Sequence, residues 1–186
     1  MGAAYCCESQ ELQNEVSLLV ETSGVVPANS EHGIDSADVA KLNEDARREE
    51  KARLKLLVRN FTSTAIRGVS CGRVDLWTGK IYEATYFIDR WLQYLTVESH
   101  GAQGRWSQKT AISRIKAILR AEEMPAGTLR VPLQPSVKDR LLLLQSEGNS
   151  KEQEIAITEV DVLHCETFVT CMNILRLYSQ NHVSNV

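Results

Sequence analysis

The chain has 186 residues, 43% of them hydrophobic, and a formal net charge of −3. This size suits one folded domain with a tail, and the mild acidity argues against a nucleic-acid-binding protein, which usually carries a basic patch. No apolar run approaches the ~20 residues of a membrane-spanning helix, and no basic segment precedes an apolar stretch as in a secretory signal. We therefore expect a chain made in the cytosol, with reduced cysteines.

The first seven residues combine a glycine at position 2 with two adjacent cysteines, Cys6 and Cys7. Gly2 can accept a myristoyl group once the initiator Met is removed, and cysteines close behind it at a bilayer surface can be palmitoylated. Cys6 stands where the usual myristoylation pattern has Ser or Thr. Dual acylation is the prediction, and a disordered N-terminus that begins Met-Gly by chance is the alternative.

Residues 1–35 form an arm that contains no Lys or Arg, the first being Lys41. A single myristoyl chain binds bilayers with only about 10⁴ M⁻¹, so stable anchoring needs a second acyl chain or a polybasic patch. The region carries acidic residues instead: Glu8, Glu11, Glu15, Glu21, Glu31, Asp35 and Asp38. An anionic leaflet repels such an arm. We expect the arm to be a disordered spacer, with Cys6 and Cys7 supplying the second anchor.

A charged helix is predicted over residues 36–53. Ser36 is a suitable N-cap, and the segment is rich in Ala, Glu, Lys and Arg, which favour helices. The pairs Glu44–Arg48 and Glu49–Arg53 have the favourable i,i+4 orientation. The apolar stripe is too short for a coiled-coil seam, so we expect a solvated helix.

Residues 54–182 are expected to form the folded domain, because β-branched and aromatic residues become frequent and turns recur, as in an antiparallel sheet. Residues 81–88 alternate, with these apolar residues on one face: Tyr82, Ala84, Tyr86 and Ile88. Residues 91–97 alternate next, after a tight connection at residues 89–90. Further strands are predicted at 140–145 and 154–159. The segment 110–119 is open between helix and strand, because Ile112, Ile115 and Ile118 have helical spacing.

The C-terminal segment predicts an amphipathic helix that ends near residues 180–182. Thr158 and Asp161 have the spacing of a capping box. Apolar residues then recur at intervals of three and four: Cys165, Phe168, Val169, Met172 and Leu175. With Cys71 and Cys171, Cys165 is expected to be a reduced thiol that fills core space.

About seven short strands followed by one amphipathic helix predict an α+β fold. The strands would form a bent antiparallel barrel, and the helix would close one of its ends. This is the pleckstrin-homology-like arrangement. The alternative is an α+β sandwich with the helix lying on an open sheet.

Gly2 with Cys6 and Cys7, the acidic linker, the charged helix and a compact domain over residues 54–182 resemble the inner membrane complex sub-compartment proteins of apicomplexan parasites. The resemblance implies a non-enzymatic scaffold with a pleckstrin-homology-like core. It implies myristoylation of Gly2 and palmitoylation of Cys6 and Cys7. It also implies attachment to the cytoplasmic face of the inner membrane complex beneath the plasma membrane, and a role, through protein partners, in organising the membrane skeleton during daughter-cell formation.

A phosphoinositide reader is the alternative function. Pleckstrin-homology domains that bind inositol phosphates usually carry a Lys before the first loop and a Lys/Arg-x-Arg set on the second strand, which hold phosphates by charge-assisted hydrogen bonds. This chain offers Arg67, Arg73 and Lys80, lacks the Lys/Arg-x-Arg set, and places Asp75 and Glu83 among them. Since function lives in sites rather than folds, we do not expect phosphoinositide binding.

An enzyme is the third possibility, and no motif supports it. His164 and Cys165 are adjacent, so on a helix they project about 100° apart and cannot pair as base and nucleophile. No zinc-ligand spacing, phosphate-cradling glycine loop or Gly-x-Ser-x-Gly occurs, and we expect no metal or cofactor. Trp77, Trp91 and Trp106 are expected to pack in the core or against loops, although an exposed one could mark a protein-binding groove.

Overall fold

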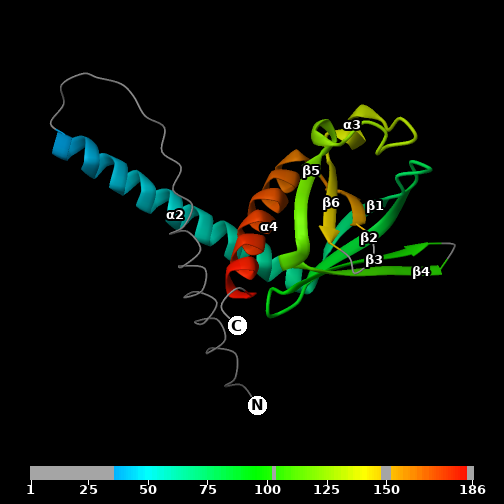
Figure 1. Ribbon diagram of the computed structural model, residues 1–186, viewed down its shortest axis with the longest axis horizontal. Coiled ribbons are helices and arrows are strands. Elements are labelled where there is room, and N and C mark those ends of the chain that lie inside the picture. The colour runs from blue at the N-terminus through cyan, green and yellow to red at the C-terminus, as the bar shows by residue number, and fades with distance from the viewer. Residues whose placement is uncertain (1–35, 102–103, 148–151, 184–186) are drawn as a thin grey trace, which may run out of the picture. The chain divides into compact units, whose positions relative to one another are not determined.

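The computed structural model describes residues 36–101, 104–147 and 152–183 (Figure 1). The chain divides into two compact units between Asn60 and Phe61. Within the described residues, no helix has the length and hydropathy needed to cross a bilayer.

Helix α2 spans Ser36–Arg67, so residues 54–67 are helical and the predicted end at residue 53 was wrong. The predicted pair of Glu44 and Arg48 is present, at 3.8 Å. Arg53 pairs with Glu50 at 2.7 Å rather than with the predicted Glu49. These pairs are solvent-exposed and contribute little stability, so this part of α2 is the solvated helix that the sequence predicts.

The last turns of α2 belong to the second unit and carry the buried residues Phe61 and Ala65, spaced four apart. Gly68 ends the helix with φ of +100°, and its amide donates to the Ala65 carbonyl at 3.2 Å. A side chain at Gly68 would meet the Phe87 ring, because an added Cβ would lie 2.4 Å from Cε1. The helix therefore stops where only glycine fits.

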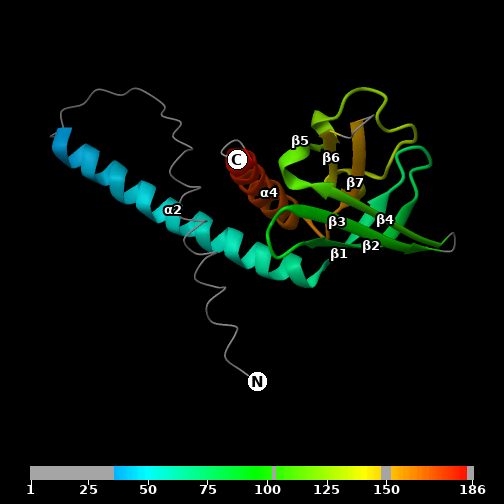
Figure 2. The ribbon, with the colours of Figure 1, turned by 60° about the horizontal axis from the view of Figure 1, so that its bottom comes forward.

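Seven strands follow in one antiparallel sheet with the order β4-β3-β2-β1-β7-β6-β5. Their bounds are β1 Val69–Val74, β2 Ile81–Ile88, β3 Tyr94–Gly101, β4 Gly104–Ala111, β5 Ile115–Arg120, β6 Leu141–Glu147 and β7 Glu152–Thr158. The sheet bends at β1, so that β5, β6 and β7 run across β2, β3 and β4 (Figures 1 and 2). The sheet ends at β4 and β5, as in an open barrel.

The predicted inner face of β2 is confirmed, since Ala84, Tyr86 and Ile88 are buried. Tyr86 packs edge-on against Phe168 with ring centroids 5.2 Å apart, and Phe61 lies 5.9 Å from Phe168. Strand β6 is buried on both faces. Its outer face forms a second cluster with Val74 and Ala156. Leu119 of β5 covers this cluster together with residues of the β5–β6 connection: Ala121, Met124, Leu129 and Leu133. That connection contains the 3-10 turn η2 (Ala121–Glu123) and the short helix α3 (Pro135–Lys138).

The segment 110–119, for which the sequence leaves helix and strand as alternatives, contains a helical turn between two strands. Strand β4 ends at Ala111, the 3-10 turn η1 spans Ile112–Arg114, and β5 begins at Ile115. Ile112, Ile115 and Ile118 are all buried. A register shift between Ile115 and Ala117 lets Ile115 and Ile118, three positions apart in β5, face the same side of the sheet. The helical spacing thus comes from a turn followed by a bulge.

The final helix, α4, spans Val162–Val183, and its predicted apolar face is buried at Cys165, Phe168, Met172 and Leu175. The predicted N-cap at Thr158 was wrong. Helix α4 begins at Val162, and the Asp161 carboxylate caps it by accepting the His164 amide at 2.8 Å. Figure 1 shows α4 beside β5. Arg176 donates to the Lys116 carbonyl and Gln180 to the Ser113 carbonyl. All seven strands precede the capping helix α4, so the predicted pleckstrin-homology-like fold is confirmed.

Candidate functional site

The candidate headgroup site lies at the end of the sheet that carries the β1–β2 loop, residues 75–80. Asp75 shapes this loop, because its carboxylate accepts the amides of Trp77 at 2.9 Å and Thr78 at 3.1 Å. These two hydrogen bonds lower the pKa of Asp75, and the bond from the Thr78 amide has the larger effect. Gly79 closes the turn with φ of +68° and donates its amide to the Asp75 carbonyl at 2.8 Å. The loop is therefore preformed, and the carboxylate that intrudes among the cations has a structural role.

Arg73 is packed inside the mouth of the barrel. It pairs with Tyr82 across β1 and β2, on the face that carries the core. Its guanidinium lies between two rings, 4.6 Å from the Tyr82 centroid and 4.5 Å from the Trp106 centroid. Its Nε donates to Ser99 Oγ at 3.1 Å. A cation sandwiched in this way supports the wall of the barrel, so Arg73 is held by its neighbours rather than extended toward solvent.

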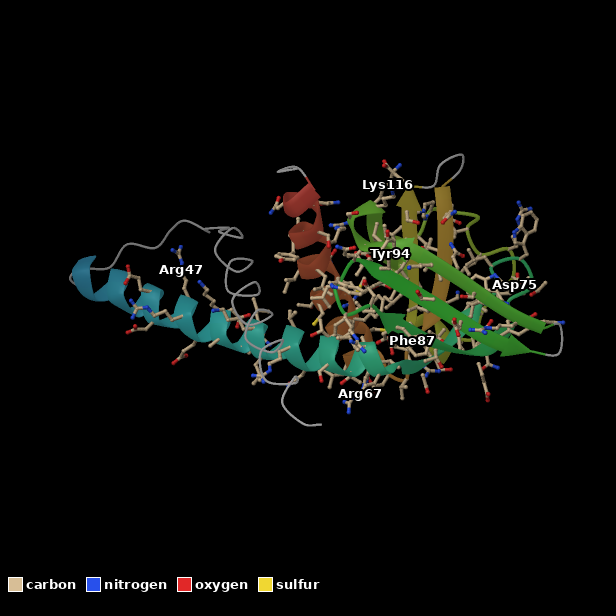
Figure 3. All side chains as sticks on the ribbon, turned by 90° about the horizontal axis from the view of Figure 1, so that it is seen from below. Arg47, Arg67, Asp75, Phe87, Tyr94 and Lys116 are labelled. Carbon is tan, nitrogen blue, oxygen red and sulfur yellow. The ribbon has the colours of Figure 1, made fainter. Side chains whose placement is uncertain are left out.

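The other two candidate cations do not complete a phosphate site. Lys80 is exposed on the β1–β2 loop at the same end as Arg73. Arg67 ends α2 before β1 begins, and its Nε donates back to the Ser63 carbonyl at 3.2 Å. Figure 3 shows Arg67 and Asp75 at opposite ends of this part of the sheet. The structure thus brings Arg73 and Lys80 to one end and places Arg67 at the other.

Trp77 is exposed on the β1–β2 loop, with 67% of its surface accessible, and the Arg130 guanidinium lies 3.9 Å from its ring centroid. Trp91 is exposed as well, at 75%, and only Trp106 is half-buried. The prediction that all three tryptophans pack in the core or against loops is therefore wrong for Trp91. The connection that carries Trp91 is longer than the expected pair at 89–90, because β3 begins only at Tyr94.

Among the described residues, the three thiols and His164 form no catalytic pair. The Cys165 thiol is buried and donates to the Arg140 carbonyl at 3.2 Å, whereas the exposed His164 ring contacts Asp161 at 2.8 Å. Burial, with the nearby Glu159 carboxyl, raises the pKa of Cys165 to about 11 and that of Cys71 to about 12, and burial alone raises that of Cys171 to about 12. Such thiols are inert. No metal-binding group of side chains occurs among the described residues.

Glu159 was missed by the sequence reasoning. It follows β7, and only 2% of its surface is exposed. Among the described residues, no donor lies within hydrogen-bond geometry of either carboxyl oxygen. Desolvation raises the pKa of Glu159. The pKa of the neighbouring Tyr86 is raised as well, mainly by burial of Tyr86 and next by the charge of the Glu159 carboxyl. No sequence signal separates Glu159 from an exposed residue at a strand end, so only the structure reveals this buried acid.

Gly2, Cys6 and Cys7 lie outside the described residues, so the proposed acylation sites have no structural account.

No family model matches this chain, and neither does any curated protein. Solved structures do match. Inner Membrane Complex Sub-compartment Protein 1 (ISP1) from Toxoplasma gondii aligns over 81% of this chain and 99% of its own, with 13% identity and a TM-score of 0.52. Sub-compartment Protein 3 (ISP3) from the same organism aligns over 68% of this chain and 87% of its own, with 17% identity and a TM-score of 0.47. The Slm1-PH domain, solved with phosphoserine, aligns over 62% of this chain and 97% of its own, with 10% identity and a TM-score of 0.40.

The class that the fold defines is a pleckstrin-homology-like domain preceded by a long helix. Within that class, this chain shares the fold of ISP1 over nearly the whole of the ISP1 structure.

Proposed function

We propose that this protein is a non-enzymatic scaffold held on the cytoplasmic face of the inner membrane complex by a myristoyl group on Gly2 and palmitoyl groups on Cys6 and Cys7. Its pleckstrin-homology-like domain then binds protein partners of the membrane skeleton and contributes to daughter-cell formation. The observation that carries the proposal is the shared fold with ISP1, whose own name places that protein in the inner membrane complex. The paired cysteines behind Gly2 support the same assignment.

The domain itself favours protein contacts over headgroup reading. A headgroup site needs several cations free to converge on phosphates. Here Arg73 is stacked between Tyr82 and Trp106, and Arg67 lies at the other end of the sheet. Of the three candidate cations, Lys80 is then the one left at the loop, and the neighbouring Arg130 is stacked on the Trp77 ring. Membrane attachment is therefore assigned to the acyl chains rather than to the domain.

Expression of the tagged chain in an apicomplexan parasite, followed by microscopy and fractionation, tests the proposal. We expect wild type on the inner membrane complex and in the carbonate-resistant pellet. Gly2→Ala should move the protein to the soluble fraction. Cys6→Ser with Cys7→Ser should leave weak, salt-insensitive and reversible association, because one myristoyl chain alone binds marginally.

Cys71→Ser is the matched control, since this thiol lies in the folded domain, and it should leave localisation unchanged. If the Cys6/Cys7 double variant stays as firmly bound as wild type, the palmitoylation proposal fails. Vesicles test the alternative function. Unacylated chain should bind phosphoinositide-containing and plain phosphatidylcholine vesicles equally, and headgroup-selective, salt-sensitive binding would replace the scaffold with a phosphoinositide reader.

A further inference from the structure

The β2–β3 loop displays the most exposed large apolar side chain of the described residues, Trp91. The neighbouring Leu92 is buried and adopts φ of +55°, the one positive value among the described non-glycine residues. A leucine in this conformation is strained. The backbone therefore turns so that Leu92 anchors the loop in the core while the Trp91 indole points away from it.

The loop is held rigidly in that conformation. The Asp89 carboxylate accepts the amides of Gln93 and Tyr94, each at 2.7 Å, and the Leu92 amide donates to the Asp89 carbonyl at 3.0 Å. The Gln93 carbonyl accepts the Ile112 amide at 2.8 Å, which fixes the loop against η1. A rigid loop loses little conformational entropy on binding, so exposed apolar surface here is prepared for a contact.

Exposed cations lie on the β2–β3 loop and on the strand and turn that adjoin it. Arg90 is the exposed neighbour of Trp91 in sequence. The Lys109 ammonium lies 4.0 Å from the ring centroid of the partly exposed Tyr94, which Figure 3 labels. Arg114 is exposed on the adjoining η1. The single carboxylate of the loop, that of Asp89, is already bonded to two loop amides. We call Trp91, Tyr94, Arg90 and Lys109 the Trp91 corner.

We propose that the Trp91 corner is a docking surface for an acidic protein segment that offers an apolar side chain to Trp91 and carboxylates to Arg90 and Lys109. Trp, Tyr and Arg are the residue types that dominate the energetics of protein interfaces, and the excess of cations selects an acidic partner by charge complementarity. The inference deepens the proposed scaffold function and rests on it, because it names the surface and the chemistry of its protein partner.

The corner is remote from the candidate headgroup site. The β1–β2 loop adjoins the Val74–Ile81 pair and the β2–β3 loop adjoins the Ile88–Leu95 pair. At about 3.3 Å per residue, these pairs are roughly 23 Å apart along β2. A protein segment on the Trp91 corner would therefore leave the β1–β2 loop uncovered.

Fluorescence anisotropy of a labelled peptide tests the proposal on full-length, unacylated chain. The probe is a peptide of repeating Glu-Glu-Leu, and the controls are Lys-Lys-Leu and Glu-Glu-Ser peptides of equal length. We expect saturable binding of the Glu-Glu-Leu peptide alone. Trp91→Ala should weaken it about 30-fold and Lys109→Glu about tenfold. Trp77→Ala, which removes another exposed indole at the other end, should change it less than about twofold.

Equal effects of Trp77→Ala and Trp91→Ala, or equal binding of the basic peptide, would overturn the proposal. Trp91-dependent binding to phosphatidylserine vesicles would assign the surface to lipid instead. A dimer in sedimentation velocity that Trp91→Ala abolishes would assign it to a second copy. Because the chain used is unacylated, loss of peptide binding leaves the anchor experiment intact, and failure of the anchor leaves the peptide result intact.

Discussion

The two ends of the β1–β4 sheet use their aromatic and cationic residues in opposite ways. At the β1–β2 end, the Arg73 guanidinium is enclosed between Tyr82 and Trp106 inside the barrel mouth. At the β2–β3 end, Trp91 projects into solvent beside exposed cations. At the β1–β2 end, rings therefore hold the Arg73 guanidinium and the Arg130 guanidinium lies on the exposed Trp77 ring, whereas at the β2–β3 end the Trp91 ring projects into solvent. Composition alone does not distinguish these uses, because only the direction of each side chain decides between them.

The largest expected effect concerns the glycine that shapes the β2–β3 end. Gly68→Ala forces a side chain into φ of +100° and against the Phe87 ring, 2.4 Å from the added Cβ. We expect a loss of about 2–4 kcal/mol in the free energy of unfolding, measured by urea denaturation. Gly127→Ala is the control, since it has φ of +88° but open space around it, and it should cost about 1 kcal/mol. Equal losses would mean that the contact with Phe87 is unimportant.

The next effect tests whether Arg73 is a structural residue. Arg73→Ala removes the stack on two rings and the bond to Ser99, so we expect a loss of about 1–2 kcal/mol in unfolding free energy. Lys80→Ala, at the exposed loop beside it, should stay within about 0.5 kcal/mol of wild type. If Arg73→Ala is as stable as wild type but changes vesicle binding, the comparison between the two ends fails.

A third prediction concerns the buried carboxyl of Glu159. Its pKa is raised in the folded state by desolvation, so the folded protein holds this proton more tightly than the unfolded chain. The contribution of this carboxyl to stability is therefore greatest below the unfolded pKa of about 4.3 and is lost as pH rises through the folded pKa. Glu159→Gln should flatten this part of a melting-temperature profile and stabilise the protein at neutral pH, whereas Glu154→Gln, which is exposed, should preserve the slope. An unchanged slope in Glu159→Gln would contradict the buried-acid assignment.

The smallest effect is a difference in labelling rate. The pKa values of Cys71 and Cys171 are raised to about 12 and that of Cys165 to about 11, so almost no thiolate is present at pH 8. Iodoacetamide should leave these three thiols unmodified in the native protein and label them all in guanidinium, as peptide mass spectrometry would show. Rapid native labelling of Cys165 would contradict its burial against Arg140.

The sequence predicted about seven antiparallel strands followed by one capping helix, and it predicted the core face of β2, because alternation and three-to-four spacing report burial directly. It failed where two signals competed. The β-branched composition of residues 54–67 indicated sheet structure, but these residues are helical. Phe61 and Ala65 already have helical spacing, and Gly68 supplies a stop. Likewise, Trp91 fitted the alternating pattern of β3, and nothing local to it reveals that Leu92 turns the backbone the other way.

The candidate site was predicted only in part, for a similar reason. Arg73 and Lys80 were identified by their place around the first hairpin, and the register confirms that they share one end. The environment of Arg73 depends on Trp106 and Ser99 from distant strands, which no local pattern reveals. Glu159 depends in the same way on Tyr86 and the surrounding core.

Mass spectrometry of the N-terminal peptide from the native protein tests the central claim most directly, because it measures the modifications that would separate membrane attachment from the folded domain. The account predicts a myristoyl group on Gly2 and hydroxylamine-sensitive palmitoyl groups on Cys6 and Cys7. An unmodified or acetylated N-terminus with free thiols at Cys6 and Cys7, on protein recovered from the membrane fraction, would contradict it.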